Sequence, residues 1–207
     1  RVLIAAGGTA GHINPALAIA GALKAADPAA EIHFAGRKEG MEYGLVTKAG
    51  YPFHHIEING FQRKPTLKNV GRNVVALYHL ALSGPRTAAI LKEVRPDLVI
   101  GCGGYVSGPV VRAAAKKGIK TAIHEQNAFP GVTNKLLAKD VDVVFAASAA
   151  AVEKLGAPES LPTAISSAAR FILSMLRRVS EYQSRIFRPK VVGSAWTPCV
   201  LPMVGVT

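Results

Sequence analysis

The chain begins with Arg1 and continues Val2-Leu3-Ile4-Ala5-Ala6-Gly7-Gly8-Thr9-Ala10-Gly11-His12. The apolar run is typical of a buried strand, and the segment from Pro15 to Ala26 is patterned like a helix. A strand that stops at paired glycines and resumes as a helix leaves backbone N–H groups unpaired, because the first turn of a helix offers them no acceptor. The sequence therefore predicts a strand, an anion-binding turn and a helix.

The residue types in this turn suit a phosphate or a diphosphate. Glycine lets an anion approach the backbone closely because no Cβ is in the way. Thr9 adds a hydroxyl donor, Pro15 suits the first turn of a helix, and His12 faces the same site. An ordinary tight turn has the same composition, since the hexamer does not match G-x-G-x-x-G, so both interpretations stay open on this stretch alone.

Short apolar runs alternate with helical patterns along the first three quarters of the chain. Such strands need crossover connections, and right-handed crossovers produce a parallel sheet with helices on both faces. The predicted fold class is α/β, a doubly wound parallel sheet of the Rossmann-like type. We expect strands at Val2–Ala6, Ile32–Ala35, Phe53–Ile58, Asp97–Gly101, Thr121–His124 and Val141–Ala146, and helices at Pro15–Ala26, Met41–Ala49, Arg86–Val94, Gly108–Lys117 and Val132–Lys139.

Two further loops follow predicted strands and carry unusual residues. They are Gly103-Gly104-Tyr105-Val106-Ser107-Gly108 and His124-Glu125-Gln126-Asn127. Ligands bind beyond the carboxyl ends of parallel strands, so we expect all three loops to share one edge. Two glycine loops suit a diphosphate, Gln126 and Asn127 offer donors and acceptors to a sugar, and Glu125 is a candidate to orient a base or bind a hydroxyl. A close packing turn and a solvated loop are the plainer alternatives.

Composition narrows the function classes. The chain has 207 residues, a formal net charge of +12 and two cysteines, Cys102 and Cys199. Two scattered cysteines predict neither a disulfide framework nor a metal site. The sequence contains no run of about 20 apolar residues, so we expect no membrane-spanning helix. The charge favours anionic partners, but no basic and aromatic motif of a nucleic-acid reader is present, so we expect no nucleic-acid partner. The absence of a leader before the first strand predicts no secretory signal.

The segment from Ile58 to Lys92 is basic and apolar, without any acidic residue. A helix of this kind suits the interface of an anionic membrane. A sheet-covering helix with a basic edge is the equal alternative, and the loop from Phe61 to Lys68 is the part we expect to be exposed.

The three loops, followed by Pro130-Gly131-Val132-Thr133-Asn134-Lys135, resemble the N-terminal domain of the MurG family within glycosyltransferase family 28. These are peripheral-membrane glycosyltransferases of peptidoglycan synthesis, and the resemblance spans Arg1 to about Pro158. It implies a two-domain GT-B fold in which the N-terminal half holds the acceptor and the C-terminal half grips the donor nucleotide. The implied reaction transfers N-acetylglucosamine from UDP-N-acetylglucosamine to undecaprenyl-diphospho-muramoylpentapeptide (lipid I), giving lipid II at the cytoplasmic face of the plasma membrane, with no cofactor.

The resemblance also implies roles for individual residues. His12 is the candidate to deprotonate the acceptor hydroxyl, with Glu125 as a rival base or orienting partner. Ala10 stands where many family members have glycine, which requires a negative φ there. Thr9, Ala10, Gly11 and Asn127 are expected to touch the donor sugar, within a substrate-binding set of Gly7, Gly8, Thr9, Ala10, Gly11, Gly103, Gly104, Tyr105, Ser107, Gln126 and Asn127.

The family pattern stops after Pro158. The expected linker and second glycine-rich domain are missing, and residues 159–207 are rich in arginine and serine. We expect a glycosyltransferase domain over residues 1–158 and an atypical tail over 159–207, either out-of-frame or foreign sequence or a genuine membrane-seeking tail with a basic helix from Ile165 to Ile186. Without the second half we expect no turnover, and the alternative function is a non-catalytic module that binds diphospholipid or anionic membrane.

Overall fold

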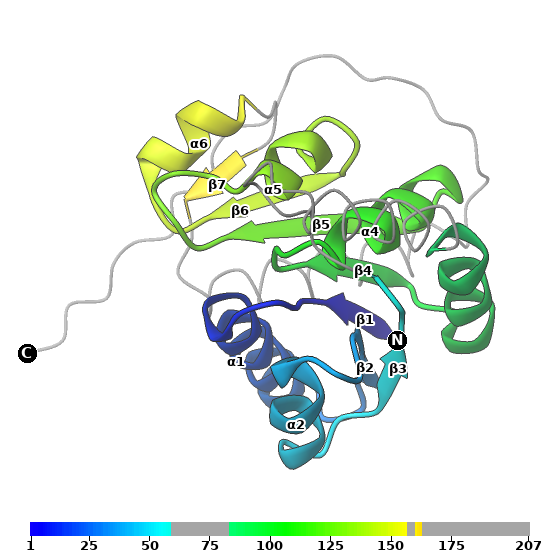
Figure 1. Cartoon of the computed structure of the whole chain (residues 1–207). Coiled ribbons are helices and arrows are strands. Elements are labelled where there is room, and N and C mark those ends of the chain that lie inside the picture. The colour runs from blue at the N-terminus through cyan, green and yellow to red at the C-terminus, as the bar shows by residue number, and fades with distance from the viewer. Residues whose placement is uncertain (59–82, 157–159, 163–207) are drawn as a thin grey trace, which may run out of the picture.

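The computed structural model describes residues 1–58, 83–156 and 160–162 of the chain. In that part, seven strands form one parallel sheet in the order β3-β2-β1-β4-β5-β6-β7 (Figure 1). The elements are β1 (Val2–Ala5), α1 (Ala10–Ala26), β2 (Ile32–Gly36), α2 (Met41–Lys48), β3 (Phe53–His55), a helix over residues 83–94, β4 (Leu98–Gly101), α4 (Ser107–Lys116), β5 (Lys120–Glu125), α5 (Val132–Leu137), β6 (Val143–Ala146), α6 (Ala149–Leu155) and β7 (Ser160–Pro162).

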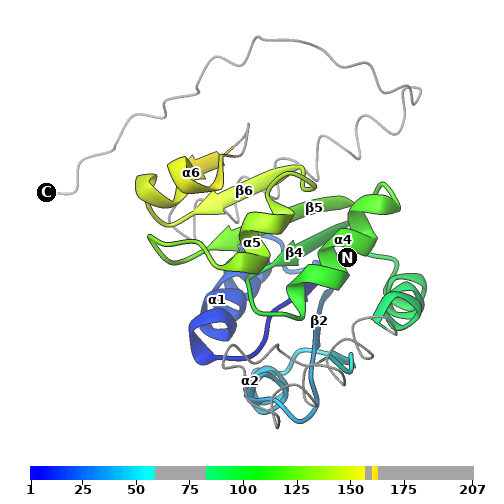
Figure 2. The same cartoon turned by 45° about the horizontal axis from the view of Figure 1, so that its top comes forward.

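Helices cover both faces of the sheet, because successive strand side chains point to opposite sides. From β1, Val2 and Ile4 pack with α1 and α2 in one core, whereas Leu3 and Ala5 pack with the other helices in a second. Figures 1 and 2 show α1 and α2 together on one side of the strands and α4 and α5 on the other. The second core also contains side chains from residues 83–94, α4, α5 and α6. The predicted doubly wound fold class is confirmed.

The strand order reverses between β1 and β4. β1 pairs with β2 on one side and with β4 on the other. After the edge strand β3, the next strand in the chain, β4, therefore lies on the opposite side of β1. In open α/β sheets the crevice at such a switch point is where ligands bind, outside the carboxyl ends of the strands. The loops after β1 and β4 flank this position.

The structure corrects several predicted boundaries. α1 begins at Ala10 and not at Pro15, because the carbonyl of Thr9 already accepts hydrogen bonds from the N–H groups of His12 and Ile13. Pro15 therefore lies inside the helix, and the prediction that it occupies the first turn is wrong. The third strand ends at His55 rather than at Ile58.

The carboxyl-terminal part of the sheet also differs from expectation. β5 extends through Glu125, so His124 and Glu125 are buried strand residues and only Gln126 and Asn127 follow the strand. α6 and β7 were not predicted, and β7 pairs with β6 through Ser160, Leu161 and Pro162. The sheet thus continues past residue 158, while the proposed division at that residue stays a prediction.

Two predicted features lie outside the described residues. They are residues 59–82, which contain the loop from Phe61 to Lys68 and most of the basic apolar segment, and the tail beyond residue 162. The last part of that segment, residues 83–92, belongs to the described helix over residues 83–94. Within the described residues, none of the helices has the length and apolar character needed to cross a membrane.

Candidate functional site

The three loops leave the same edge of the sheet. β1, β4 and β5 are consecutive neighbours and all parallel, so their carboxyl ends lie side by side. The loops that begin at Gly7, Gly103 and Gln126 therefore start from adjacent strand ends. This arrangement confirms the expected shared edge.

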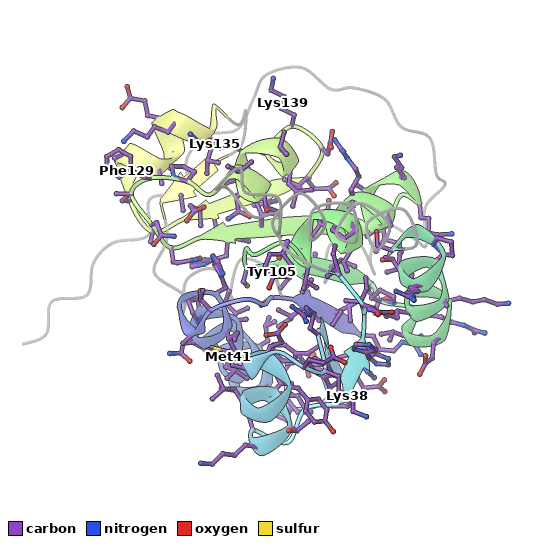
Figure 3. The ribbon with its side chains drawn as sticks, in the orientation of Figure 1. Lys38, Met41, Tyr105, Phe129, Lys135 and Lys139 are labelled. Carbon is purple, nitrogen blue, oxygen red and sulfur yellow. The ribbon has the colours of Figure 1, made fainter. Side chains whose placement is uncertain are left out.

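The two glycine loops are in direct contact. A Cβ on Gly104 would lie 2.2 Å from the carbonyl oxygen of Gly7, and one on Gly103 would lie 2.7 Å from Cδ2 of His12. Both glycines have a positive φ, 98° at Gly103 and 77° at Gly104, a conformation that side chains rarely adopt. The ring of Tyr105 lies against Gly8, and Figure 3 shows Tyr105 near the middle of the view. Glycine is required at Gly104 because the backbone of Gly7 fills the space of a side chain, and at Gly103 because the ring of His12 fills it.

Ser107 joins the second loop to the first strand. Its hydroxyl is fully buried, accepts a hydrogen bond from the N–H of Gly103 (3.1 Å) and lies 2.7 Å from the carbonyl oxygen of Ala5. The hydroxyl is also 2.8 Å from the carbonyl oxygen of Gly103. The described contacts of Ser107 are internal, and its predicted role in binding substrate stays a prediction.

Unpaired backbone donors remain at the edge. Among the described residues, no acceptor faces the N–H groups of Ala10 and Gly11 at the start of α1, or those of Gly104 and Tyr105. The first two residues are exposed and the other two are half-buried. Arg95 is the one non-glycine residue of the described chain with a positive φ, so Ala10 has the negative φ that its side chain requires. Open amides at a helix N-terminus and a glycine turn attract anions.

The N–H of Gly8 is not one of the open donors. It faces a carboxylate oxygen of Glu42 at 3.4 Å, and the other oxygen of Glu42 accepts from the N–H of Arg37 at 3.0 Å. Glu42 is 1% exposed and belongs to the first turn of α2. Sequence analysis missed this residue, because a glutamate in the first turn of a helix has no distinctive pattern.

His12 is half-buried and held by its Nδ1 atom. That nitrogen lies 3.1 Å from the carbonyl oxygen of Gly7 and 3.2 Å from the hydroxyl of Thr9. A carbonyl oxygen can only accept, so the bond to Gly7 requires the proton on Nδ1. The lone pair then sits on Nε2, and a neutral imidazole in this tautomer is able to take a proton from a neighbouring hydroxyl.

Glu125 holds the third loop from inside the protein. Its carboxylate is 1% exposed and accepts four hydrogen bonds. One oxygen receives the backbone and side-chain N–H groups of Asn127, at 2.9 and 3.0 Å. The other receives the N–H of Gly131 at 3.0 Å and the amide of Asn134 at 2.9 Å. These bonds fix exposed Asn127 in place, and they leave Glu125 no exposed oxygen for a substrate.

The remaining polar groups near the edge are buried. Neither ring nitrogen of His124 makes a hydrogen bond of regular geometry among the described residues, nor does the side-chain oxygen of Gln126. Burial lowers the pKa of His124, although the charge of nearby Glu125 and the polar side chain of Gln126 act in the opposite direction. Burial raises the pKa of Cys102 to about 12, so its thiol stays protonated. In residues 1–58, 83–156 and 160–162 no three His, Cys, Asp or Glu side chains are grouped as a metal site requires.

Comparison with known proteins gives a consistent result. The family model described as the glycosyltransferase family 28 N-terminal domain matches residues 2–146. A relative from Ruminiclostridium cellulolyticum, named UDP-N-acetylglucosamine-N-acetylmuramyl-(pentapeptide) pyrophosphoryl-undecaprenol N-acetylglucosamine transferase, is 51% identical over 144 residues. Those residues are 70% of this chain and 38% of the relative. A transferase of the same name from Bacillus cereus is 48% identical over 160 residues, 77% of this chain and 42% of the relative.

A solved structure agrees with these relatives. Acinetobacter baumannii MurG is 33% identical with a TM-score of 0.59, over 70% of this chain and 40% of that one. A UDP-N-acetylglucosamine 2-epimerase from Rickettsia bellii, 16% identical with a TM-score of 0.52, shares the fold alone. The matched residues span about 40% of the length of the two transferase relatives and of the MurG structure.

The four hydrogen bonds of Glu125 generate a prediction. In Glu125→Gln, one oxygen becomes an NH₂ group that cannot accept, so two buried or half-buried donors lose their acceptor. We expect the free energy of unfolding, measured by urea denaturation, to fall by about 2–4 kcal/mol. Glu153→Gln, on an exposed side chain of α6, is the control and should change it by less than about 0.5 kcal/mol. A Glu125→Gln protein as stable as the parent would contradict the loop-holding role.

Proposed function

This chain belongs to glycosyltransferase family 28, and on that premise we propose that it is the acceptor-side part of an N-acetylglucosaminyltransferase that converts lipid I to lipid II. The observation that carries the proposal is the set of open amides of Ala10, Gly11, Gly104 and Tyr105 at one edge of the sheet. The name of these relatives specifies a pyrophosphoryl-undecaprenol acceptor, and a pyrophosphoryl group is the ligand that such amides suit.

The diphosphate of the acceptor binds between the two glycine loops. Its oxygens accept hydrogen bonds from the N-terminal amides of α1 and from those of Gly104 and Tyr105, where the absence of Cβ atoms permits close approach. The helix dipole of α1 adds a favourable electrostatic interaction. Side chains of Tyr105 and Ser107 shape the second loop, and Gln126 is the first residue of the third.

His12 is the proposed base. Nε2 takes the proton of the muramoyl hydroxyl as the hydroxyl oxygen attacks the anomeric carbon of N-acetylglucosamine. The bond from that carbon to the diphosphate of UDP breaks, and its electron pair leaves with UDP. The Nδ1–H bond to Gly7 supports this role, because it keeps the lone pair on Nε2. Glu125 contributes by positioning Asn127, and Thr9, Ala10, Gly11 and Asn127 contact the donor sugar.

The donor nucleotide requires a second half. The aligned residues cover 38% of the R. cellulolyticum relative. Holding both substrates in a reactive geometry supplies much of the rate enhancement in transferases. The residues described here therefore bind the acceptor, and UDP binding is assigned to the remaining part of a complete enzyme.

A transfer assay tests this function. The chain is incubated with lipid I and radiolabelled UDP-N-acetylglucosamine, alone and with the C-terminal half of the R. cellulolyticum relative supplied separately. We expect lipid I binding in both cases and lipid II formation only with the added half. His12→Gln should preserve binding and reduce transfer by about 10²–10⁴-fold, the usual contribution of a general base. Failure of the chain to bind lipid I, or transfer unaffected by His12→Gln, would refute the proposal.

A membrane-binding module on the cytoplasmic face is the second candidate function. Its support is an exposed apolar surface on α5 and the loop before it, formed by Phe129 (77% exposed), Val132 (65%) and Leu136 (63%). Lys154 lies 3.6 Å from the ring centre of Phe129, and exposed Lys135 and Lys139 belong to the same region. Figure 3 shows Phe129, Lys135 and Lys139 along the upper part of the molecule. Apolar side chains flanked by lysines suit an anionic lipid surface.

Vesicle sedimentation tests this surface. The double variant Val132→Ser/Leu136→Ser removes two exposed side chains that would enter the lipid interface, so binding to phosphatidylglycerol vesicles should weaken by about tenfold. The matched control is Met41→Ser/Leu45→Ser, an exposed pair at the same spacing on α2, which should bind as the parent does. Equal weakening by both double variants, or binding insensitive to salt, would contradict the assignment to α5.

A further inference from the structure

Glu42 is a buried carboxylate beneath the first glycine loop. It is the second residue of α2, where the helix dipole favours a negative group. Its side chain links two loops that follow neighbouring strands, because it faces the N–H of Gly8 after β1 and accepts from the N–H of Arg37 after β2. In the described residues it has no basic side chain as an ion-pair partner. Among the described residues, the polar groups that contact the Glu42 carboxylate are therefore these two backbone N–H groups.

Three glycines leave room for this side chain. A Cβ on Gly7 would lie 2.7 Å from Oε1 of Glu42, and one on Gly40 would lie 2.2 Å from Oε2. A Cβ on Gly36 would lie 2.8 Å from Cγ of Glu42. Three separate positions without side chains thus surround one carboxylate. A buried carboxylate that is hydrogen-bonded to the backbone and closely surrounded in this way holds that backbone in a single arrangement.

The Gly7–Gly8 segment connects Glu42 to His12. Glu42 faces the N–H of Gly8, and the carbonyl oxygen of the preceding residue, Gly7, lies 3.1 Å from Nδ1 of His12. These two groups belong to the same peptide unit, which is planar and rigid. Fixing the N–H toward Glu42 therefore fixes the direction in which the carbonyl faces the imidazole.

We propose that Glu42 is a positioning residue that sets the tautomer of His12 through the Gly7–Gly8 peptide. The carboxylate orients the peptide, the peptide carbonyl accepts the Nδ1 proton, and Nε2 is left with the lone pair. With the N–H of Gly8 reserved for Glu42, the next open amides, those of Ala10 and Gly11, remain for the ligand. The consequence for catalysis rests on the proposed function, whereas the coupling to His12 is a property of the free protein.

Nitrogen-15 NMR of the histidine-labelled chain tests the coupling without any substrate. Above the titration range of histidine, the ring-nitrogen shifts report which nitrogen carries the proton, and His12→Gln identifies the signals. We expect the Nδ1–H form to predominate in the parent, the reverse of the preference of a free histidine side chain. In Glu42→Gln the ratio of the two forms should fall by about fivefold, as expected for the loss of one ordinary hydrogen bond.

Two further variants complete the design. Glu39→Gln is the matched control, since its exposed side chain lies in the loop before the same helix and its nearest ionic partner is Arg37, 4.0 Å away. This variant should keep the parent ratio. Gly40→Ala displaces the carboxylate without removing it and should shift the ratio in the same direction as Glu42→Gln, which keeps the test decisive if the latter does not fold.

The outcomes separate this inference from the proposed function. A parent in which Nε2–H predominates overturns the inference, as does a folded Glu42→Gln or Gly40→Ala protein with the parent ratio. An equal shift in Glu39→Gln also overturns it, because the tautomer ratio would then respond to the loss of any nearby negative charge. None of these results depends on lipid I binding, so failure of the transferase assay leaves the coupling intact.

Discussion

The peptide unit between Gly7 and Gly8 is the point on which the rest of the site depends. Gly104 packs directly on the Gly7 carbonyl, so the loops after β1 and β4 approach to backbone contact. The same carbonyl orients His12, and the N–H of the unit faces buried Glu42. A side chain at Gly104 would separate the strand ends, because the space that it needs is already filled by the backbone of Gly7. Close backbone packing thus determines where the open amides lie.

The fold followed from the sequence because its signals are local and repeated. Central apolar runs such as Leu98–Gly101 are buried on both faces, and helical patterns separate the runs, which leaves a parallel sheet as the arrangement that satisfies both. The shared edge of the three loops then followed from topology alone. Helix starts were harder to predict, since the cap at Thr9 acts through its backbone carbonyl and the proline signal at Pro15 lies one and a half turns further on.

The roles of the two buried glutamates could not be predicted in the same way. Glu125 was expected to act as a base, to orient one or to bind a hydroxyl, whereas its partners at Gly131 and Asn134 lie six and nine residues away and meet it only once the loop has folded. Glu42 depends on Gly8 and Arg37, which belong to different loops. A carboxylate surrounded by backbone donors looks like any other acidic residue in the sequence. Both residues organise the loops that carry the proposed binding groups. The two carboxylates are buried below these loops, and the open N–H groups lie at the edge of the sheet.

The central claim is that open amides from two glycine loops bind a diphosphate together. The most direct measurement is an amide NMR titration of this chain with geranyl diphosphate, a soluble polyprenyl diphosphate, with geraniol as the uncharged comparison. The account predicts that the largest diphosphate-specific changes occur at the N–H groups of Ala10, Gly11, Gly104 and Tyr105. Changes confined to α5 or other surfaces, or equal changes with geraniol, would contradict it.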